Sequence, residues 1–186
     1  MQTLCVVGDD APVVADALVD AIAESRDGRI AAVDYGNSVA SEIPVDAADH
    51  NADGQFNLTE NGRWVGRADD CSLVDLLDSL ASNYEYAIVA GTSHHRLPTV
   101  VVGDATDEPE NIVADAPTAD AVDIDDLVAR IDDFEPHVTL QTLIDQVEAS
   151  PLAERSGAIA TFTGRVRIKD DPDDDRTEQL AFEKYE

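Results

Sequence analysis

Two arginines one residue apart, Arg165 and Arg167, close a strand-like stretch near the end of a very acidic chain. Six of the twelve Lys and Arg residues, including both lysines, lie between residues 155 and 186, where eight acids leave a net charge of −2. Residues 1–154 carry 32 acids against six cations. Guanidinium groups bind phosphate bidentately, so this enrichment is consistent with an anionic ligand. The alternative is that the cations balance the neighbouring acidic run, residues 170–176.

The residues around these arginines alternate as a β-strand requires. One face carries Ile159, Thr161, Thr163, Arg165 and Arg167, and the other carries Ala158, Ala160, Phe162, Gly164 and Val166. Glycine inside a strand indicates a bulge or a close backbone approach. Residues 178–186 alternate again after the acidic run. The pattern predicts an antiparallel hairpin with a long charged loop.

A strand, a glycine turn and a helix at the start of the chain invite comparison with a nucleotide-binding P-loop. That loop needs a Gly-Lys-Ser/Thr triplet to bind phosphates and magnesium. Counted from Gly8, residues 13–15 are Val, Val and Ala. Asp9 and Asp10 would also repel phosphate at the helix N-terminus. The sequence therefore argues against an active nucleotide hydrolase.

Histidine, cysteine and aspartate give no spacing that fixes a metal site. His94 and His95 are adjacent, and neighbouring residues seldom ligate one ion, so we expect an exposed loop pair. Asp34 is interpreted as an acid at a strand end. Cys5 lies in an apolar run, which predicts a buried, reduced thiol. We expect neither a metal nor a cofactor.

The bulk charge is −28, with 40 acids distributed along the whole length. This distribution is typical of proteins adapted to concentrated salt, where screening mutes self-repulsion. An acidic interaction protein is the alternative, but its charge would gather in a tail. We expect a cytoplasmic protein with no nucleic-acid partner, because there is no basic stripe, and with no membrane segment.

The elements that must position these residues alternate between strand and helix. Strands are predicted at residues 3–7, 29–35, 84–91, 97–104 and 110–115. A helix is predicted from Asp10, as N-cap, because apolar residues recur at helical spacing after it: Val13, Val14, Ala17, Leu18, Ala21 and Ile22. A second helix is predicted from Ser72, with Asp75 at the capping-box position. A third is predicted with Ile124, Leu127, Val128 and Ile131 inward. Asn61-Gly62 predicts a hairpin. The expected fold class is α/β, with a parallel or mixed sheet.

The composition changes near residues 135–137, which we interpret as a domain boundary. Residues 1–134, notably the start of the chain and residues 84–104, resemble MobB, the adaptor protein of molybdopterin guanine dinucleotide synthesis. The resemblance implies a MobB-like domain with a degenerate P-loop, acting as a scaffold or docking module. A short strand and a helix are expected after Pro136.

Residues 137–186 resemble the start of the catalytic large (MoaE-like) subunit of molybdopterin synthase, an α+β domain. The matching residues are Gly157, Ala158, Phe162, Gly164, Val166 and Arg167, then Leu180, Glu183 and Tyr185. The resemblance implies transfer of two sulfurs to cyclic pyranopterin monophosphate from thiocarboxylates on a small ubiquitin-like subunit. It also implies a homodimer whose pocket draws on both copies.

In that resemblance, Arg167 binds the anionic substrate and Phe162 lines the site. The catalytic lysines of the family lie downstream of the position of Glu186, and Lys169 and Lys184 do not match them. We therefore expect either a fragment or a protein without catalysis. A non-catalytic adaptor of the same pathway and a nucleotide-binding P-loop protein are the alternative functions.

Overall fold

The computed structural model describes residues 1–36, 54–68, 70–94, 97–105, 109–151, 153–155, 158 and 160–161. The chain divides into two compact units, Met1–Asp145 and Gln146–Glu186. The division falls within one helix, α4 (Leu140–Glu148).

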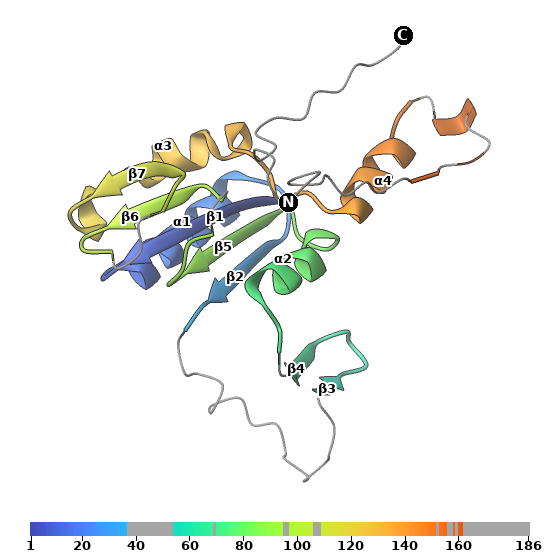
Figure 1. The fold of residues 1–186 in the computed structure, drawn as a ribbon, viewed down its shortest axis with the longest axis horizontal. Coiled ribbons are helices and arrows are strands. Elements are labelled where there is room, and N and C mark those ends of the chain that lie inside the picture. The colour runs from blue at the N-terminus through green and yellow to red at the C-terminus, as the bar shows by residue number, and fades with distance from the viewer. Residues whose placement is uncertain are drawn as a thin grey trace, which may run out of the picture. The chain divides into compact units, whose positions relative to one another are not determined.

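The first unit is built on a parallel sheet of five strands (Figure 1). In spatial order these are β2 (Ile30–Asp34), β5 (Tyr86–Ala90), β1 (Gln2–Gly8), β6 (Thr99–Val102) and β7 (Ile112–Ala116). Every residue of β5 and β6 is buried, as expected for interior strands of a parallel sheet. The predicted α/β class and all five predicted strands are confirmed.

Helices cover both faces of this sheet. Leu4 and Val6 of β1 pack with α1 (Ala11–Ser25) and α3 (Ile124–Ala129), whereas Cys5, on the opposite face, packs with α2 (Leu73–Ala81). Alternate residues of one strand therefore serve two separate apolar cores. The predicted helix after Asp10 is confirmed as α1, whose buried stripe contains Val14, Leu18 and Ile22, whereas Val13 is 59% exposed.

A separate antiparallel hairpin joins β3 (Gly54–Leu58) to β4 (Trp64–Ala68). The predicted Asn61-Gly62 turn lies at its tip. Gly62 has φ +82°, and its N–H donates to the carbonyl of Thr59 at 2.9 Å. The hairpin prediction is confirmed.

After α3 the described chain contains only short elements and α4. The short elements after α3 are the 3-10 turns η3 (Ile131–Asp133) and η4 (Ala153–Arg155). A further 3-10 turn, η2 (Ala119–Ala121), precedes α3. The predicted helix after Pro136 is confirmed as α4, but the predicted strand before it is wrong. His137 only exchanges two backbone hydrogen bonds with Met1, too few to form a strand. No helix among the described ranges is long and apolar enough to span a membrane.

Candidate functional site

The carboxyl ends of the parallel strands form the edge where α/β sheets bind ligands. From β1 the chain moves to one side for β2 and β5 and to the other for β6 and β7, so the switch point lies beside Gly8. Three adjacent strands finish at a glycine with positive φ. Gly8 is the last residue of β1 (φ +109°), Gly91 follows β5 (φ +93°) and Gly103 follows β6 (φ +71°). A Cβ at Gly8 would lie 1.9 Å from the Val102 carbonyl oxygen, so backbone contact excludes any other residue there.

The turn between β1 and α1 places carboxylates where a P-loop would place phosphate-binding groups. Asp10 occupies the predicted N-cap position, but its side chain makes no capping bond. Its Oδ2 instead accepts a hydrogen bond from the Ala119 N–H at 3.4 Å. Val14, at the position of the P-loop lysine, is 1% exposed and packs in the core. This turn therefore offers no cation to a phosphate.

The loop after β5 places the backbone of His94 next to the thiol of Cys5. Cys5 is fully buried, and burial raises the pKa of its thiol to about 12 despite a hydrogen bond with the backbone of His94. The prediction of a buried free thiol at Cys5 is confirmed. His94 is partly buried, not exposed as expected, because its loop folds against β1; His95 lies outside the described residues. Across the described ranges, no group of three or more His, Cys, Asp or Glu could hold a metal ion.

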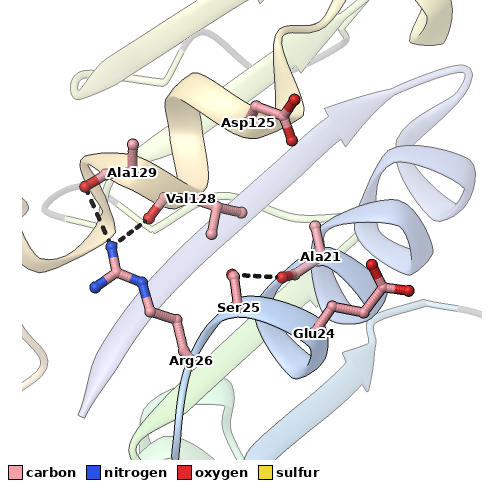
Figure 2. A pocket seen from close by; sticks show the side chains of 7 residues that line it. All are labelled: Ala21, Glu24, Ser25, Arg26, Asp125, Val128 and Ala129. Carbon is pink, nitrogen blue, oxygen red and sulfur yellow. Dashed lines mark hydrogen bonds between the residues drawn. The ribbon is translucent and has the colours of Figure 1, made fainter.

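A hollow of about 400 Å³ lies between the end of α1 and α3 (Figure 2). Among the described residues that line it, Arg26 is the one cation, and Figure 2 shows its guanidinium turned to the end of α3. The guanidinium donates to the carbonyls of Val128 at 2.9 Å and Ala129 at 3.2 Å, and pairs with Asp132 at 2.9 Å. These contacts satisfy the last turn of α3. The Arg26 guanidinium therefore caps the end of α3 and pairs with Asp132, rather than facing a ligand.

A second hollow of about 370 Å³ lies at the amino end of the sheet. The described residues of its lining include Glu85 and Asp132 but no Lys or Arg. Carboxylates without a cation disfavour an anionic ligand. Neither hollow is therefore a suitable phosphate site.

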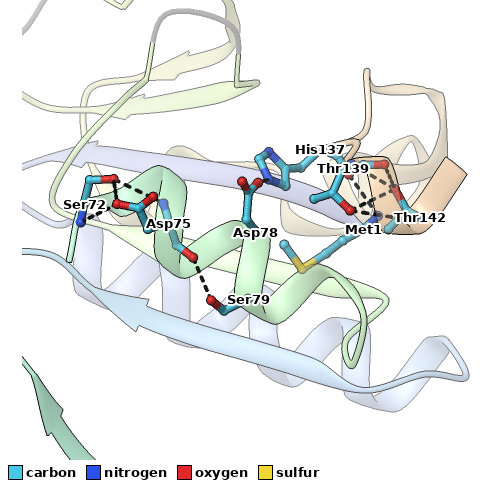
Figure 3. A network of polar contacts seen from close by, with 8 residues as sticks. All are labelled: Met1, Ser72, Asp75, Asp78, Ser79, His137, Thr139 and Thr142. Carbon is cyan, nitrogen blue, oxygen red and sulfur yellow. Dashed lines mark hydrogen bonds and ion pairs between the residues drawn. The ribbon is translucent and has the colours of Figure 1, made fainter. Parts of the chain in front are cut away.

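A polar network connects α2 to the chain that leads into α4 (Figure 3). Ser72 and Asp75 form the predicted capping box: the Asp75 N–H donates to Ser72 Oγ at 3.2 Å, and the Ser72 N–H donates to Asp75 Oδ2 at 3.2 Å. The hydrogen bonds from the side chain and backbone of Ser72 lower the pKa of the exposed Asp75 carboxyl. The capping prediction is confirmed.

The same network contains contacts that sequence reasoning missed. His137 Nε2 lies 2.7 Å from Asp78 Oδ1, and the His137 N–H donates to the Met1 carbonyl at 2.9 Å. Two residues later, Thr139 Oγ1 accepts from the Thr142 N–H at 3.1 Å and caps α4. Asp78 and His137 are 59 residues apart, so no local spacing pattern reveals their contact.

Both substrate-binding residues predicted from the sequence, Phe162 and Arg167, lie outside the described residues, as does most of the predicted hairpin around them. Their predicted role is therefore still a prediction. In the described part of the chain, an acidic turn with Asp9 and Asp10 lies at the carboxyl edge of the parallel sheet.

Comparison with known proteins gives one clear relationship. No protein-family model matches the chain. The chain is 43% identical over 190 aligned residues to the probable molybdopterin synthase of Haloferax volcanii. The alignment covers 100% of this chain and 68% of that relative.

Proposed function

The chain belongs to the molybdopterin synthase family, and on that ground we propose that it acts in molybdenum cofactor biosynthesis. The observation that carries the proposal is the similarity to the Haloferax volcanii protein, which covers 100% of this chain. It extends over both compact units, so the proposal does not depend on a short motif.

Within this pathway we propose the role of the catalytic large subunit. The substrate is cyclic pyranopterin monophosphate, and the sulfur arrives as a thiocarboxylate on the last glycine of a small ubiquitin-like subunit. The large subunit acts as a homodimer. The motif at residues 157–167 supports this role, because its aromatic, glycine and arginine have the spacing of that subunit.

Arg167 is proposed to bind the substrate phosphate and Phe162 to line the pterin pocket. The charge distribution supports the first assignment. Residues 155–186 carry a net charge of −2 in a chain of −28, so an anion meets far less repulsion there than elsewhere. By contrast, the turn with Asp9 and Asp10 at the carboxyl edge of the sheet would repel an anion.

Residues 1–134 are proposed to be a MobB-like domain with a degenerate P-loop, and residues 137–186 the start of the large-subunit domain. The parallel five-stranded sheet is compatible with the first assignment. None of the residues of α4 is buried, although Leu140, Leu143 and Val147 recur at helical spacing. This exposure is expected of a helix that lies outside the core of the first domain.

The test uses the full-length gene product that carries this chain, its thiocarboxylated small subunit and cyclic pyranopterin monophosphate. Mass spectrometry of the pterin should show the gain of two sulfurs. Replacing Arg167 with Ala should lower kcat/KM about 10- to 150-fold, because a charge-assisted hydrogen bond to phosphate contributes roughly 1.5–3 kcal/mol. Arg176→Ala, in the acidic run, is the matched control and should leave the rate unchanged.

Two results would revise the proposal. A full-length protein that binds the small subunit but transfers no sulfur would be an adaptor of the pathway rather than the enzyme. An Arg167→Ala protein as active as the parent would remove Arg167 from the substrate site while leaving the family assignment in place.

A further inference from the structure

The tip of the β3–β4 hairpin exposes an asparagine directly before a glycine. Asn61 and Gly62 are both exposed. Among the described residues, none other than the chain neighbours of Gly62 lies within 4 Å of the position that a Cβ on Gly62 would take. The backbone nitrogen of Gly62 therefore has no bulky group beside it that would obstruct its approach to the Asn61 side chain.

This dipeptide can undergo an intramolecular reaction, since asparagine is among the chemically labile residues. The Gly62 nitrogen loses its proton and attacks Cγ of Asn61, so that a new C–N bond forms. The bond from Cγ to Nδ2 breaks, and Nδ2 takes up the displaced proton and leaves as ammonia. Water then opens the resulting succinimide ring at either carbonyl, which gives aspartate or isoaspartate. Water is the one co-reactant.

Thr59 contacts both reacting groups. Its carbonyl accepts a hydrogen bond from the Gly62 N–H at 2.9 Å, and this bond must break before the nitrogen can lose its proton. Its hydroxyl is hydrogen-bonded to Asn61 Oδ1, which also accepts from the Arg63 N–H at 3.4 Å. The same hydroxyl lies 2.7 Å from the Arg63 carbonyl oxygen. Thr59 therefore restrains the attacking nitrogen and the side-chain carbonyl together.

We propose that Asn61 is a site of spontaneous deamidation, and that Thr59 slows the reaction by holding the turn closed. Each conversion adds a negative charge to the hairpin tip. Isoaspartate also lengthens the backbone path between residues 61 and 62 by one carbon atom. Because loop length sets the pairing of a hairpin, this product should loosen the β3–β4 pair. The inference is independent of the proposed function, since it involves neither Arg167 nor Phe162.

Incubation of the full chain at mildly alkaline pH and fixed potassium chloride tests the site. Peptide mapping by mass spectrometry measures the conversion of amide to acid at each asparagine. Asn83 is the internal control, because it is also exposed and the N–H that follows it, on Tyr84, also donates within a turn, to the Leu80 carbonyl at 3.0 Å. Asn61 should convert on the order of tenfold faster than Asn83, because glycine lacks the side chain that shields the Tyr84 nitrogen. Equal rates at the two sites overturn the proposal.

Thr59→Val tests the restraint, because it removes the hydroxyl and nearly keeps the shape of the side chain. Asn61 should then convert about fivefold faster, as expected for the loss of one net hydrogen bond, with no change at Asn83. Thr59→Ser keeps the hydroxyl and should convert at the rate of the parent. In urea, which unfolds the hairpin, all three proteins should convert at one common rate. A folded Thr59→Val protein that converts no faster than the parent overturns the role of Thr59, because its hydroxyl would then be without effect or would activate the Asn61 carbonyl.

Discussion

Two buried threonines on neighbouring strands should respond in opposite directions to the same substitution. Thr3 on β1 is 2% exposed and Thr99 on β6 is fully buried. Cys5 is the register partner of Thr99 and lies two residues after Thr3, so both threonines share the α2 face of the sheet. They differ in their hydroxyls. Thr99 Oγ1 donates to the Leu97 carbonyl at 3.0 Å, whereas Thr3 Oγ1 has no hydrogen-bond partner among the described residues.

Valine replaces the hydroxyl with a methyl group of similar size. At Thr3 it removes a buried polar group without a partner, which should raise the free energy of unfolding by about 1 kcal/mol. At Thr99 it removes a hydrogen bond and leaves a buried carbonyl with one fewer donor, which should lower the same free energy by about 1 kcal/mol. The β-propensity of valine affects both sites equally, so the difference of about 2 kcal/mol reports the hydroxyls.

Urea denaturation of the parent, Thr3→Val and Thr99→Val at one fixed potassium chloride concentration measures this difference. Far-UV circular dichroism follows the transition of the sheet unit, and equal slopes allow the midpoints to be compared. In thermal scans the two variants should lie about 4–8 °C apart, since each kcal/mol shifts Tm by roughly 2–4 °C at this size. If both variants lose stability to the same degree, the hydroxyl of Thr3 is satisfied and the reasoning fails.

Three further predictions follow from single sites. Gly8→Ala should destabilise the sheet unit by more than about 3 kcal/mol in urea titrations, because its Cβ would lie 1.9 Å from a carbonyl oxygen of β6; a midpoint like that of the parent would contradict this. Ellman's reagent should label the exposed Cys71 in the native protein and reach Cys5 only in denaturant, since a thiol with a pKa of about 12 is on the order of 10⁻⁴ ionised at pH 8. Ser72→Ala should destabilise by about 1 kcal/mol through the lost cap. The pKa of Asp75 is lowered in the folded protein, so its carboxylate stabilises the fold above the ordinary Asp pKa, and this stabilisation is lost as the pH falls through the lowered pKa. Acid titrations of Ser72→Ala should show a smaller loss of stability at low pH than those of the parent. A loss equal to that of the parent would refute the assignment.

The five strands and their flanking helices could be predicted because each has a local signal. The apolar run of β1, the capping pair Ser72 and Asp75, and the Asn61-Gly62 turn each fix their own element within a few residues. The apolar periodicity predicted the helix α1 but not which of its apolar residues are buried: Val13 lies outside the buried stripe, because periodicity identifies a stripe but not its width.

Contacts between distant residues could not be predicted from the sequence in the same way. Asp10 has the right residue type and position for an N-cap, but its side chain binds the backbone of Ala119, and only the tertiary fold brings the two together. The pair of Asp78 and His137 is a second case. For Phe162 and Arg167 the sequence supplies a motif and a charge argument, while the arrangement of their side chains lies outside the described residues.

The central position of β1 has a consequence for synthesis of the chain. This strand is synthesised before the other four strands of the sheet, yet its partners β5 and β6 begin only about 80 and about 90 residues after it ends. At roughly 5–20 residues per second, the apolar run of β1 must wait on the order of 5–20 s before either neighbour can bond to it. During that interval a nascent chain with two open strand edges is a natural client for a chaperone that shields extended apolar segments.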